Sequence, residues 1–156
     1  MNLIQALRRA CQLRGTGTAV IDARGALDWN TFVGRVGRLA AGLQSMGVRA
    51  GDRVAVLGQS SGRYIECYFG PLWIGAAVVP VNSRLSVEEA IFLINDSGAR
   101  VLVVDRSFQE MAQALSEQCH ALEHLVFADD GPPPAGMVAY EALLATQSTV
   151  PEVVEG

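Results

Sequence analysis

The segment of residues 75–105 constrains the fold more than any other part of the chain. It reads GAAVVPVNSRLSVEEAIFLINDSGARVLVVD, in which a polar turn and a helix-like stretch separate two apolar runs. Ser86 and Glu89 have the spacing of a capping box, where each side chain binds the backbone amide of the other residue. Gly98 suits the left-handed conformation that ends a helix, and the β-branched run after it is typical of a buried parallel strand. The segment therefore predicts a strand–helix–strand unit.

The rest of the chain repeats this alternation. Counting their caps, helices are expected over residues 3–13, 28–47, 60–75, 108–119 and 140–145, and strands over residues 53–57, 76–81, 101–105 and 124–128. Two further short strands, residues 18–22 and 26–29, are expected to form a hairpin. This order predicts an α/β fold, with parallel-sheet layers flanked by helices and a short β-hairpin near the N-terminus.

Composition limits the class of protein. Half of the 156 residues are apolar, which fits one folded domain with its own core. No apolar stretch reaches the roughly 18 residues of a membrane span, and the paired arginines near the N-terminus do not precede a long apolar block as in a signal peptide. We therefore expect a cytoplasmic protein without a transmembrane segment. The net charge of −4 and the scattered arginines argue against nucleic-acid binding.

Few residues are candidates for catalysis or metal binding. Cys11, Cys67 and Cys119 are far apart in the sequence, and His120 and His124 have no partner at the spacing of metal ligands. No metal site is therefore expected. All twelve basic residues are arginines, so the chain has no lysine to place on a phosphate or an acyl carboxylate.

Several segments, in order and spacing, resemble the acyl-CoA synthetase and adenylate-forming enzyme superfamily. Residues 28–32 read DWNTF where that family starts a helix with Thr-Tyr-Ala-Glu-Leu, and residues 47–58 read GVRAGDRVAVLG, similar to its GVxxGDRVA element. Residues 75–105 resemble its GAVVVPLNPRLTPEEL and DSGAKVLIVD stretches, with Ser83 in place of a common proline. The resemblance covers roughly residues 17–105, and it rests on the joint match rather than on one diagnostic motif.

The resemblance implies that the chain is the N-terminal portion of such an enzyme. Residues 1–145 would form an incomplete α/β subdomain of the adenylation core, and residues 146–156 a mobile tail leading to the family's phosphate loop, which the chain lacks. The whole enzyme would use ATP, Mg²⁺ and CoA to convert a carboxylic acid, such as a fatty acid, into its CoA thioester. No catalytic residue can be assigned within the chain, so the chain alone is expected to be inactive.

The same resemblance implies that the remainder of the adenylation domain covers part of this chain. Apolar surface is therefore expected to be exposed when the chain is isolated. Through that surface the isolated chain could form a homodimer.

The resemblance suggests a binding role for one residue. In some acyl-CoA ligases the arginine of an Asn-Pro-Arg-Leu turn reaches the phosphate on the CoA nucleotide, and Arg84 has that position here. A guanidinium on an exposed turn suits a phosphate dianion. The alternative is a solvated arginine, or an ion pair between Arg84 and Glu88.

Two other functions stay open at this point. Residues 58–62 read GQSSG, the pattern of an α/β-hydrolase nucleophile elbow, with Ser60 as nucleophile and Asp105 and His120 or His124 as partners. Two serines before a helix are more often caps, however. The chain could instead be a non-catalytic α/β binding or interaction domain.

Overall fold

Six α-helices and seven β-strands make up the part of the chain that the structure describes, residues 3–154 of a computed structural model. The helices are α1 (Leu3–Arg14), α2 (Trp29–Ser45), α3 (Gly62–Trp73), α4 (Val87–Ser97), α5 (Gln109–Gln118) and α6 (Tyr140–Ala145). The strands are β1 (Thr18–Asp22), β2 (Gly25–Asp28), β3 (Arg53–Leu57), β4 (Ala77–Pro80), β5 (Val101–Val104), β6 (His124–Phe127) and β7 (Met137–Ala139). The predicted α/β class is confirmed.

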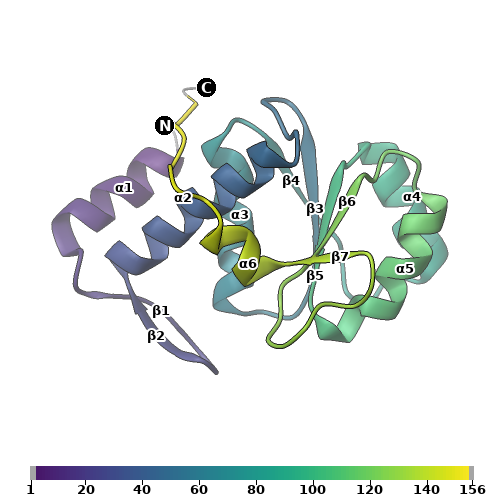
Figure 1. Ribbon diagram of the computed structural model, residues 1–156, viewed down its shortest axis with the longest axis horizontal. Coiled ribbons are helices and arrows are strands. Elements are labelled where there is room, and N and C mark those ends of the chain that lie inside the picture. Colours follow the sequence, from purple (N-terminus) through teal and green to yellow (C-terminus); the bar gives the residue numbers. More distant parts are fainter. Residues whose placement is uncertain (1–2, 155–156) are drawn as a thin grey trace.

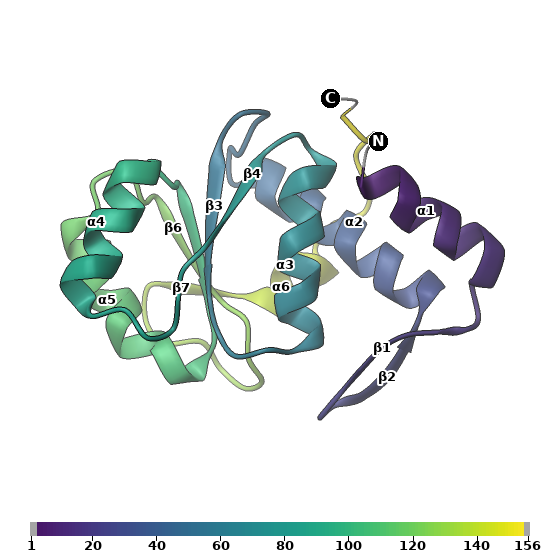
Figure 2. The ribbon, with the colours of Figure 1, turned by 180° about the vertical axis from the view of Figure 1, so that it is seen from behind.

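Strands β3 to β7 form one parallel sheet in the order β4-β3-β5-β6-β7, so that β4 and β7 are its edges. Helices α2, α3 and α6 lie on one face of this sheet, and α4 and α5 lie on the other (Figure 1). The antiparallel hairpin of β1 and β2 and helix α1 lie outside the α2–α3 layer, as the view from behind also shows (Figure 2). Among residues 3–154, none of the helices combines the length and apolar character that crossing a bilayer requires.

The residues that the sequence predicts as helix caps form those caps in the structure. Asp28 accepts a hydrogen bond from Thr31 N at the start of α2. At α4 both bonds of the capping box are present, from Glu89 N to Ser86 Oγ at 3.2 Å and from Ser86 N to Glu89 Oε2 at 2.8 Å. Gly98 ends α4 with φ of 64°, the left-handed conformation that glycine adopts without strain.

The structure differs from the prediction in a few places. The predicted helix of residues 108–119 begins with a separate 3₁₀ turn, Arg106–Phe108, because Asp105 caps that turn through Ser107 N. Strand β7 was not predicted. It has three residues and an exposed middle one, Val138, which is too short a pattern for alternation to reveal.

The sheet separates two cores of different composition. The core under α4 and α5 consists of apolar side chains, among them Leu57, Ile94, Leu102, Leu115 and Phe127. The core under α2, α3 and α6 is larger and lies beside two buried charged residues, Arg63 and Glu66. Arg35 and Arg63 join Glu66 and Glu141 across this second core by ion pairs.

Residues 147–154 have no helix or strand, yet they pack on the α2–α3 layer. Trp73 Nε1 donates to Pro151 O at 2.8 Å, and Val154 N donates to Trp73 O at 3.0 Å. Val150 lies against Gly37 of α2, where a Cβ atom would come within 2.6 Å of it. The predicted tail of residues 146–156 thus has defined contacts as far as Val154. Residues 155–156, like residues 1–2 of the predicted subdomain, lie outside the described part.

Candidate functional site

The carboxyl ends of the parallel strands form one edge of the sheet, and the strand order creates a crevice there. After β3 the chain continues to β4 on one side, whereas after β5 it continues to β6 on the other. In doubly wound sheets ligands commonly bind at such a switch point. The crevice between the two turns is narrow, and its lining includes Gln59, Ser61 and Tyr64 from one side and Asp105 and Ala128 from the other.

At this crevice, carboxylates of the chain itself accept hydrogen bonds from backbone N–H groups. Gln59 N donates to Asp105 Oδ2 at 2.5 Å, and Gly62 N donates to Asp22 Oδ2 at 2.8 Å. The bond from Gly62 lowers the pKa of Asp22, which favours its charged form. A phosphate at the start of α3 would therefore have to displace these carboxylates. Because carboxylates of the chain already accept the bonds from Gln59 N and Gly62 N, the crevice is not an open anion-binding site.

The structure does not assemble the serine-hydrolase triad. Ser60 follows the carboxyl end of β3, and Ser61 is the residue that caps α3 by accepting from Tyr64 N. His124 begins β6, and His120 precedes it, so both histidines lie at the opposite, amino edge of the sheet. The length of β3 alone separates Ser60 from both histidines by roughly 10 Å or more along the strands. This geometry contradicts the hydrolase alternative.

Arg84 lies on the exposed turn between β4 and α4. Its backbone N–H donates to Asn82 Oδ1 at 2.9 Å, which holds the turn. Among residues 3–154 its guanidinium makes no ion pair, so the pair with Glu88 that the sequence allowed is not formed. A shallow hollow lies beside this turn, with Tyr64 and Pro80 among its lining residues. The structure thus leaves the Arg84 side chain available to a ligand.

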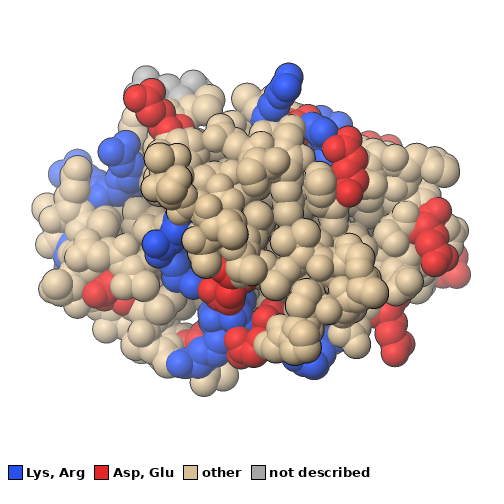
Figure 3. All heavy atoms as spheres, in the orientation of Figure 1, with Lys and Arg blue, Asp and Glu red and all other residues tan. Residues whose placement is uncertain are grey.

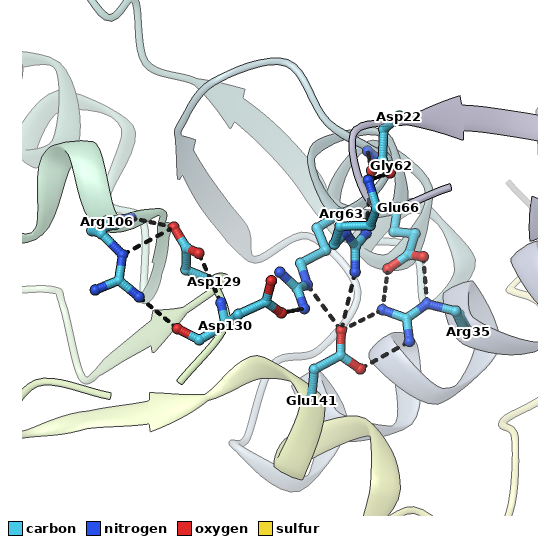
Figure 4. Close-up of polar contacts among 10 residues, drawn as sticks. Asp22, Arg35, Gly62, Arg63, Glu66, Arg106, Asp129, Asp130 and Glu141 are labelled. Carbon is cyan, nitrogen blue, oxygen red and sulfur yellow. Dashed lines mark hydrogen bonds and ion pairs between the residues drawn. The ribbon is translucent and has the colours of Figure 1, made fainter. Parts of the chain in front are cut away.

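The most extensive polar cluster lies deeper, between α2, α3 and α6 (Figure 4). Arg35 on α2 donates to both carboxylate oxygens of Glu66 on α3, at 2.6 and 3.1 Å, and to both of Glu141 on α6, at 2.9 and 2.8 Å. Arg63 donates to Glu141 at 2.9 Å and to Asp130 at 2.7 Å. Bidentate bonds of this kind are among the strongest in proteins. We call these five residues the ion cluster.

Burial and pairing shift the pKa values of Arg35 and Glu141 in the ion cluster and of the tyrosine beside it. Tyr140 Oη donates to Glu66 Oε2 at 2.7 Å, and burial raises the pKa of Tyr140 well above its usual value. Hydrogen bonds from Arg35 lower the pKa of Glu141 to about 2 despite partial burial. Burial lowers the pKa of Arg35, but its bonds to Glu141 and Glu66 outweigh this effect and raise it. Arg35 and Glu141 therefore keep their charges, and Tyr140 stays neutral, near pH 7.

The ion cluster is a structural cross-link. Among residues 3–154, no buried side-chain nitrogen or oxygen lacks a hydrogen-bond partner, so its buried polar groups are satisfied. Nor does any group of three or more His, Cys, Asp or Glu residues in the described part offer a metal site. Sequence reasoning missed this cluster. The available signal was Arg63 and Glu66, one turn apart in a helix that is otherwise apolar.

Comparison with known proteins places this geometry in context. Residues 7–154 match the family model described as AMP-binding enzyme. The chain is 32% identical to a long-chain-fatty-acid–CoA ligase of Thermus thermophilus, over 99% of this chain and 29% of that protein. It is 40% identical to a feruloyl-CoA synthase of an Amycolatopsis species, over 83% of this chain and 27% of that protein. The chain thus spans less than a third of the length of these relatives.

Solved structures share the fold. The anthranilate CoA ligase AuaEII, in complex with anthranoyl-AMP, superposes with a TM-score of 0.93 at 25% identity, over 99% of this chain and 30% of that chain. A putative long-chain-fatty-acid CoA ligase from Rhodopseudomonas palustris gives a TM-score of 0.90 at 27% identity, over 100% of this chain and 39% of that chain. The sheet, its two helix layers and the hairpin therefore form a recurring structural unit.

Proposed function

The chain belongs to the AMP-binding enzyme family, and from this premise we propose that it is part of an ATP-dependent acyl-CoA synthetase. The observation that carries the proposal is the match along nearly the whole chain to proteins named as CoA ligases. We propose a fatty acid or a related carboxylate as the substrate, and ATP, Mg²⁺ and CoA as the other reactants. The cytoplasmic location expected from the sequence belongs to the same proposal.

The reaction we propose has two steps. The substrate carboxylate attacks the α-phosphorus of Mg-ATP, which forms an acyl-adenylate and releases pyrophosphate. The CoA thiol then attacks the acyl carbon and displaces AMP. Both steps need cations on the phosphoryl oxygens and exclusion of water from the mixed anhydride. Residues 1–145 serve as scaffold in this proposal, and we assign none of them to the chemical steps.

Arg84 is the residue of this chain that we place on a ligand. Its guanidinium is exposed and unpaired within residues 3–154, and its turn is fixed by the bond to Asn82. A guanidinium matches the geometry of a phosphate dianion. We therefore propose that Arg84 binds the phosphate on the nucleotide portion of CoA.

The test begins with the coding sequence after Gly156. If it encodes the rest of an AMP-binding enzyme, the complete product is assayed for acid-dependent exchange of pyrophosphate into ATP and for CoA-dependent release of AMP. We expect both activities with one class of carboxylic acid, and neither from the 156-residue chain alone. Pyrophosphate release by that chain would overturn the scaffold role. A complete product that activates no acid in a broad panel would overturn the ligase proposal.

Arg84 is tested in the complete product. Arg84→Ala should raise the Michaelis constant for CoA about tenfold, the effect of losing a bond worth about 1.4 kcal/mol, and leave those for acid and ATP unchanged. Arg14→Ala, on the exposed end of α1, is the matched control. An unchanged Michaelis constant for CoA would show that Arg84 does not bind the CoA phosphate.

A non-catalytic α/β binding domain is the second candidate function. Its non-catalytic character is favoured by the absence of lysine from the whole chain and by the bonds that close the switch-point crevice. A natural reading frame that ends at Gly156, together with an inactive product, would exclude the ligase reaction for that product and favour this second candidate.

A further inference from the structure

Residues 1–21 differ in charge from the rest of the chain. They contain three arginines, Arg8, Arg9 and Arg14, and no aspartate or glutamate, which gives this stretch a net charge of +3. The remaining residues contain nine arginines and all sixteen acidic residues, a net charge of −7. A basic stretch within an acidic chain is typical of a surface that meets an anionic partner.

The three arginines of α1 are exposed and make no ion pair within residues 3–154. Glu152 lines the same hollow as Arg8, but these two side chains are not paired either. Arg35 and Arg63, by comparison, each pair with two carboxylates. Figure 3 shows arginine side chains over α1. Carboxylates of the described chain therefore leave the charges of α1 unpaired.

The same stretch exposes large apolar side chains. Among residues 3–154, four large apolar side chains are more than half exposed, and three of them, Leu3 at 59%, Leu13 at 73% and Ile21 at 77%, lie before Asp22. Single exposed leucines are ordinary at a protein surface. Here they coincide with unpaired arginines in a stretch that has no acidic residue, and this coincidence points to one partner for both.

Helical spacing places the leucines and two of the arginines on one side of α1. Leu3, Ala6, Ala10 and Leu13 follow one another at intervals of three and four residues, so they form one strip along the helix. Arg9 lies on one side of this strip, and Arg14 lies on the other. We call Leu3, Leu13, Arg9 and Arg14 the outer α1 face.

The opposite side of α1 holds the helix on the protein. Ile4 and Leu7 are 0% and 6% exposed and belong to the core under α2 and α3. Cys11 Sγ donates to Asn30 Oδ1 at 3.2 Å, at the start of α2. Helix α1 lies at one end of the molecule, outside the α2–α3 layer (Figure 1). The outer α1 face can therefore meet a partner while the helix stays in place.

We propose that the outer α1 face docks on the surface of a lipid bilayer that contains anionic lipid. Basic amphipathic helices lie in the plane of such a surface, with apolar side chains among the acyl chains and arginines near the lipid phosphates. A nucleic acid or an acidic protein would match the arginines but would give the leucines no apolar environment. The inference goes beyond the proposed ligase reaction and does not rest on it.

Co-sedimentation with lipid vesicles tests the surface. The 156-residue chain and the product of its complete reading frame are each mixed with vesicles of phosphatidylcholine, with and without phosphatidylglycerol. We expect both proteins to bind the vesicles that contain phosphatidylglycerol. Raising the salt from about 0.1 M to about 1 M shortens the Debye length from about 10 Å to about 3 Å and should release them.

Two pairs of variants assign the binding to α1. Arg9→Gln should weaken it about fivefold, the effect of one arginine near an anionic surface, whereas Arg49→Gln, an exposed arginine outside α1, should not change it. Leu13→Ser should weaken binding by a similar factor, because it removes an apolar group from the interface. Phe92→Ser is the matched control, since Phe92 is 74% exposed on α4 beside acidic residues.

A fluorescent label reports contact with lipid at one position. Leu13→Cys and Phe92→Cys are made separately in a Cys11→Ser background, since Cys67 and Cys119 are buried, and each carries a polarity-sensitive fluorophore. Vesicles with phosphatidylglycerol should shift the emission of the label at position 13 to the blue and leave that at position 92 unchanged. Equal shifts at both positions would overturn the proposal.

The other contrary outcomes each name a different partner or none. Equal binding to both kinds of vesicle, or binding to neither, would overturn the proposal, as would binding by the 156-residue chain but not by a longer product. Loss of binding in Arg9→Gln but not in Leu13→Ser would assign the arginines to a soluble polyanion instead. Self-association without lipid that Arg9→Gln abolishes would assign the face to a second copy. Because the readout is lipid binding, its failure leaves the ligase proposal intact, and the reverse also holds.

Discussion

Helices α3 and α4 flank the same sheet on opposite faces and place their charged residues in opposite positions. Helix α4 buries Ala90 and Ile94 and exposes Glu88 and Glu89. Helix α3 buries Arg63 and Glu66 and exposes uncharged side chains. On the molecular surface, acidic side chains are visible over the end formed by α4 and α5 (Figure 3). The two layers therefore use the hydrophobic effect and ion pairing in different proportions.

The difference shows how each layer should respond to change. Apolar burial under α4 and α5 is shared among many contacts, each of which contributes modestly. The ion cluster under α3 is stable because every member has a partner, and the loss of one partner leaves a charge buried without compensation. The α3 layer should therefore be the one that is sensitive to single polar substitutions.

The largest effect is expected at Glu66, the fully buried member of the ion cluster. Glu66→Gln keeps the volume but removes the charge that Arg35 and Tyr140 Oη bind, so it should lower the free energy of unfolding by about 3–5 kcal/mol. Glu89→Gln, in the exposed capping box of α4, should cost about 1 kcal/mol or less. Urea denaturation of both variants measures the difference. Equal losses of unfolding free energy in the two variants would show that the α3 layer is no more sensitive to polar substitution than the α4 layer.

Replacing several partners together separates pairing from burial as such. The triple variant Arg35→Met, Glu66→Leu and Tyr140→Phe fills the same space with apolar groups and leaves Glu141 paired with Arg63. It should be less destabilised than Glu66→Gln, within about 2 kcal/mol of the parent protein, because buried pairs and well-packed apolar groups are nearly equivalent. A triple variant that is less stable than Glu66→Gln would show that the ion cluster itself stabilises the fold.

Acid should weaken the α3 layer through Glu141. Hydrogen bonds from Arg35 lower its pKa from 4.5 to about 2, so folding favours the charged form. This contribution is complete above about pH 4.5 and is lost as the pH falls from there toward about 2. Glu141→Gln should reduce the slope of stability against pH in that window. Glu88→Gln, on the exposed start of α4, is the control. An unchanged slope in Glu141→Gln would exclude this carboxylate as the source.

The two layers also differ in how well the sequence predicts them. The start and end of α4 follow from Ser86, Glu89 and Gly98, which act within one turn of the chain, and the structure confirms all three. The ion cluster joins Arg35 to Glu66 and Glu141, which lie 31 and 106 positions away. Local periodicity assigns charged residues to the surface of a helix, so it cannot reveal partners brought together by the fold.

The same restriction of sequence patterns to local structure explains which other parts of the candidate site could be predicted. The GQSSG pattern is local, but the histidines that it would need lie at the opposite edge of the sheet, which only the strand register shows. Arg84 was placed on its turn correctly, because the turn is defined by the neighbouring strand and capping box. Its proposed ligand depends on family resemblance, since an exposed side chain without a partner carries no local signal of what it binds.

A pair of glycines in α2 tests the tail that packs on the α3 side. A Cβ atom at Gly37 would lie 2.6 Å from Val150, whereas one at Gly34 would meet nothing within 4 Å. Gly37→Ala should therefore displace the tail and lose about 1–3 kcal/mol, while Gly34→Ala should gain about 0.5–1 kcal/mol from helix propensity. Thermal unfolding measures both, and proteolysis near Val150 reports release of the tail. Stabilisation by both variants would mean that the tail contact contributes nothing.

The smallest expected difference lies in the caps of the two helices, where the local chemistry is the same and the surroundings differ. Ser61 Oγ and Ser86 Oγ each accept one backbone bond, from Tyr64 N at 3.1 Å and Glu89 N at 3.2 Å. At α4 the bond is exposed, so water can replace the hydroxyl, and Ser86→Ala should cost about 0.5–1 kcal/mol. At α3 it is partly buried, so Tyr64 N would lose a partner that water replaces less readily.

Ser61→Ala should therefore cost about 1–2 kcal/mol, more than Ser86→Ala although the deleted atom is identical. Urea denaturation of both variants in parallel, with Ser116→Ala on the exposed side of α5 as a control for the loss of a hydroxyl, measures the difference. The reverse order would mean that water reaches the start of α3 as freely as it reaches α4. In that case the sensitivity of the α3 layer would be confined to the ion cluster and would not extend to the helix that carries it.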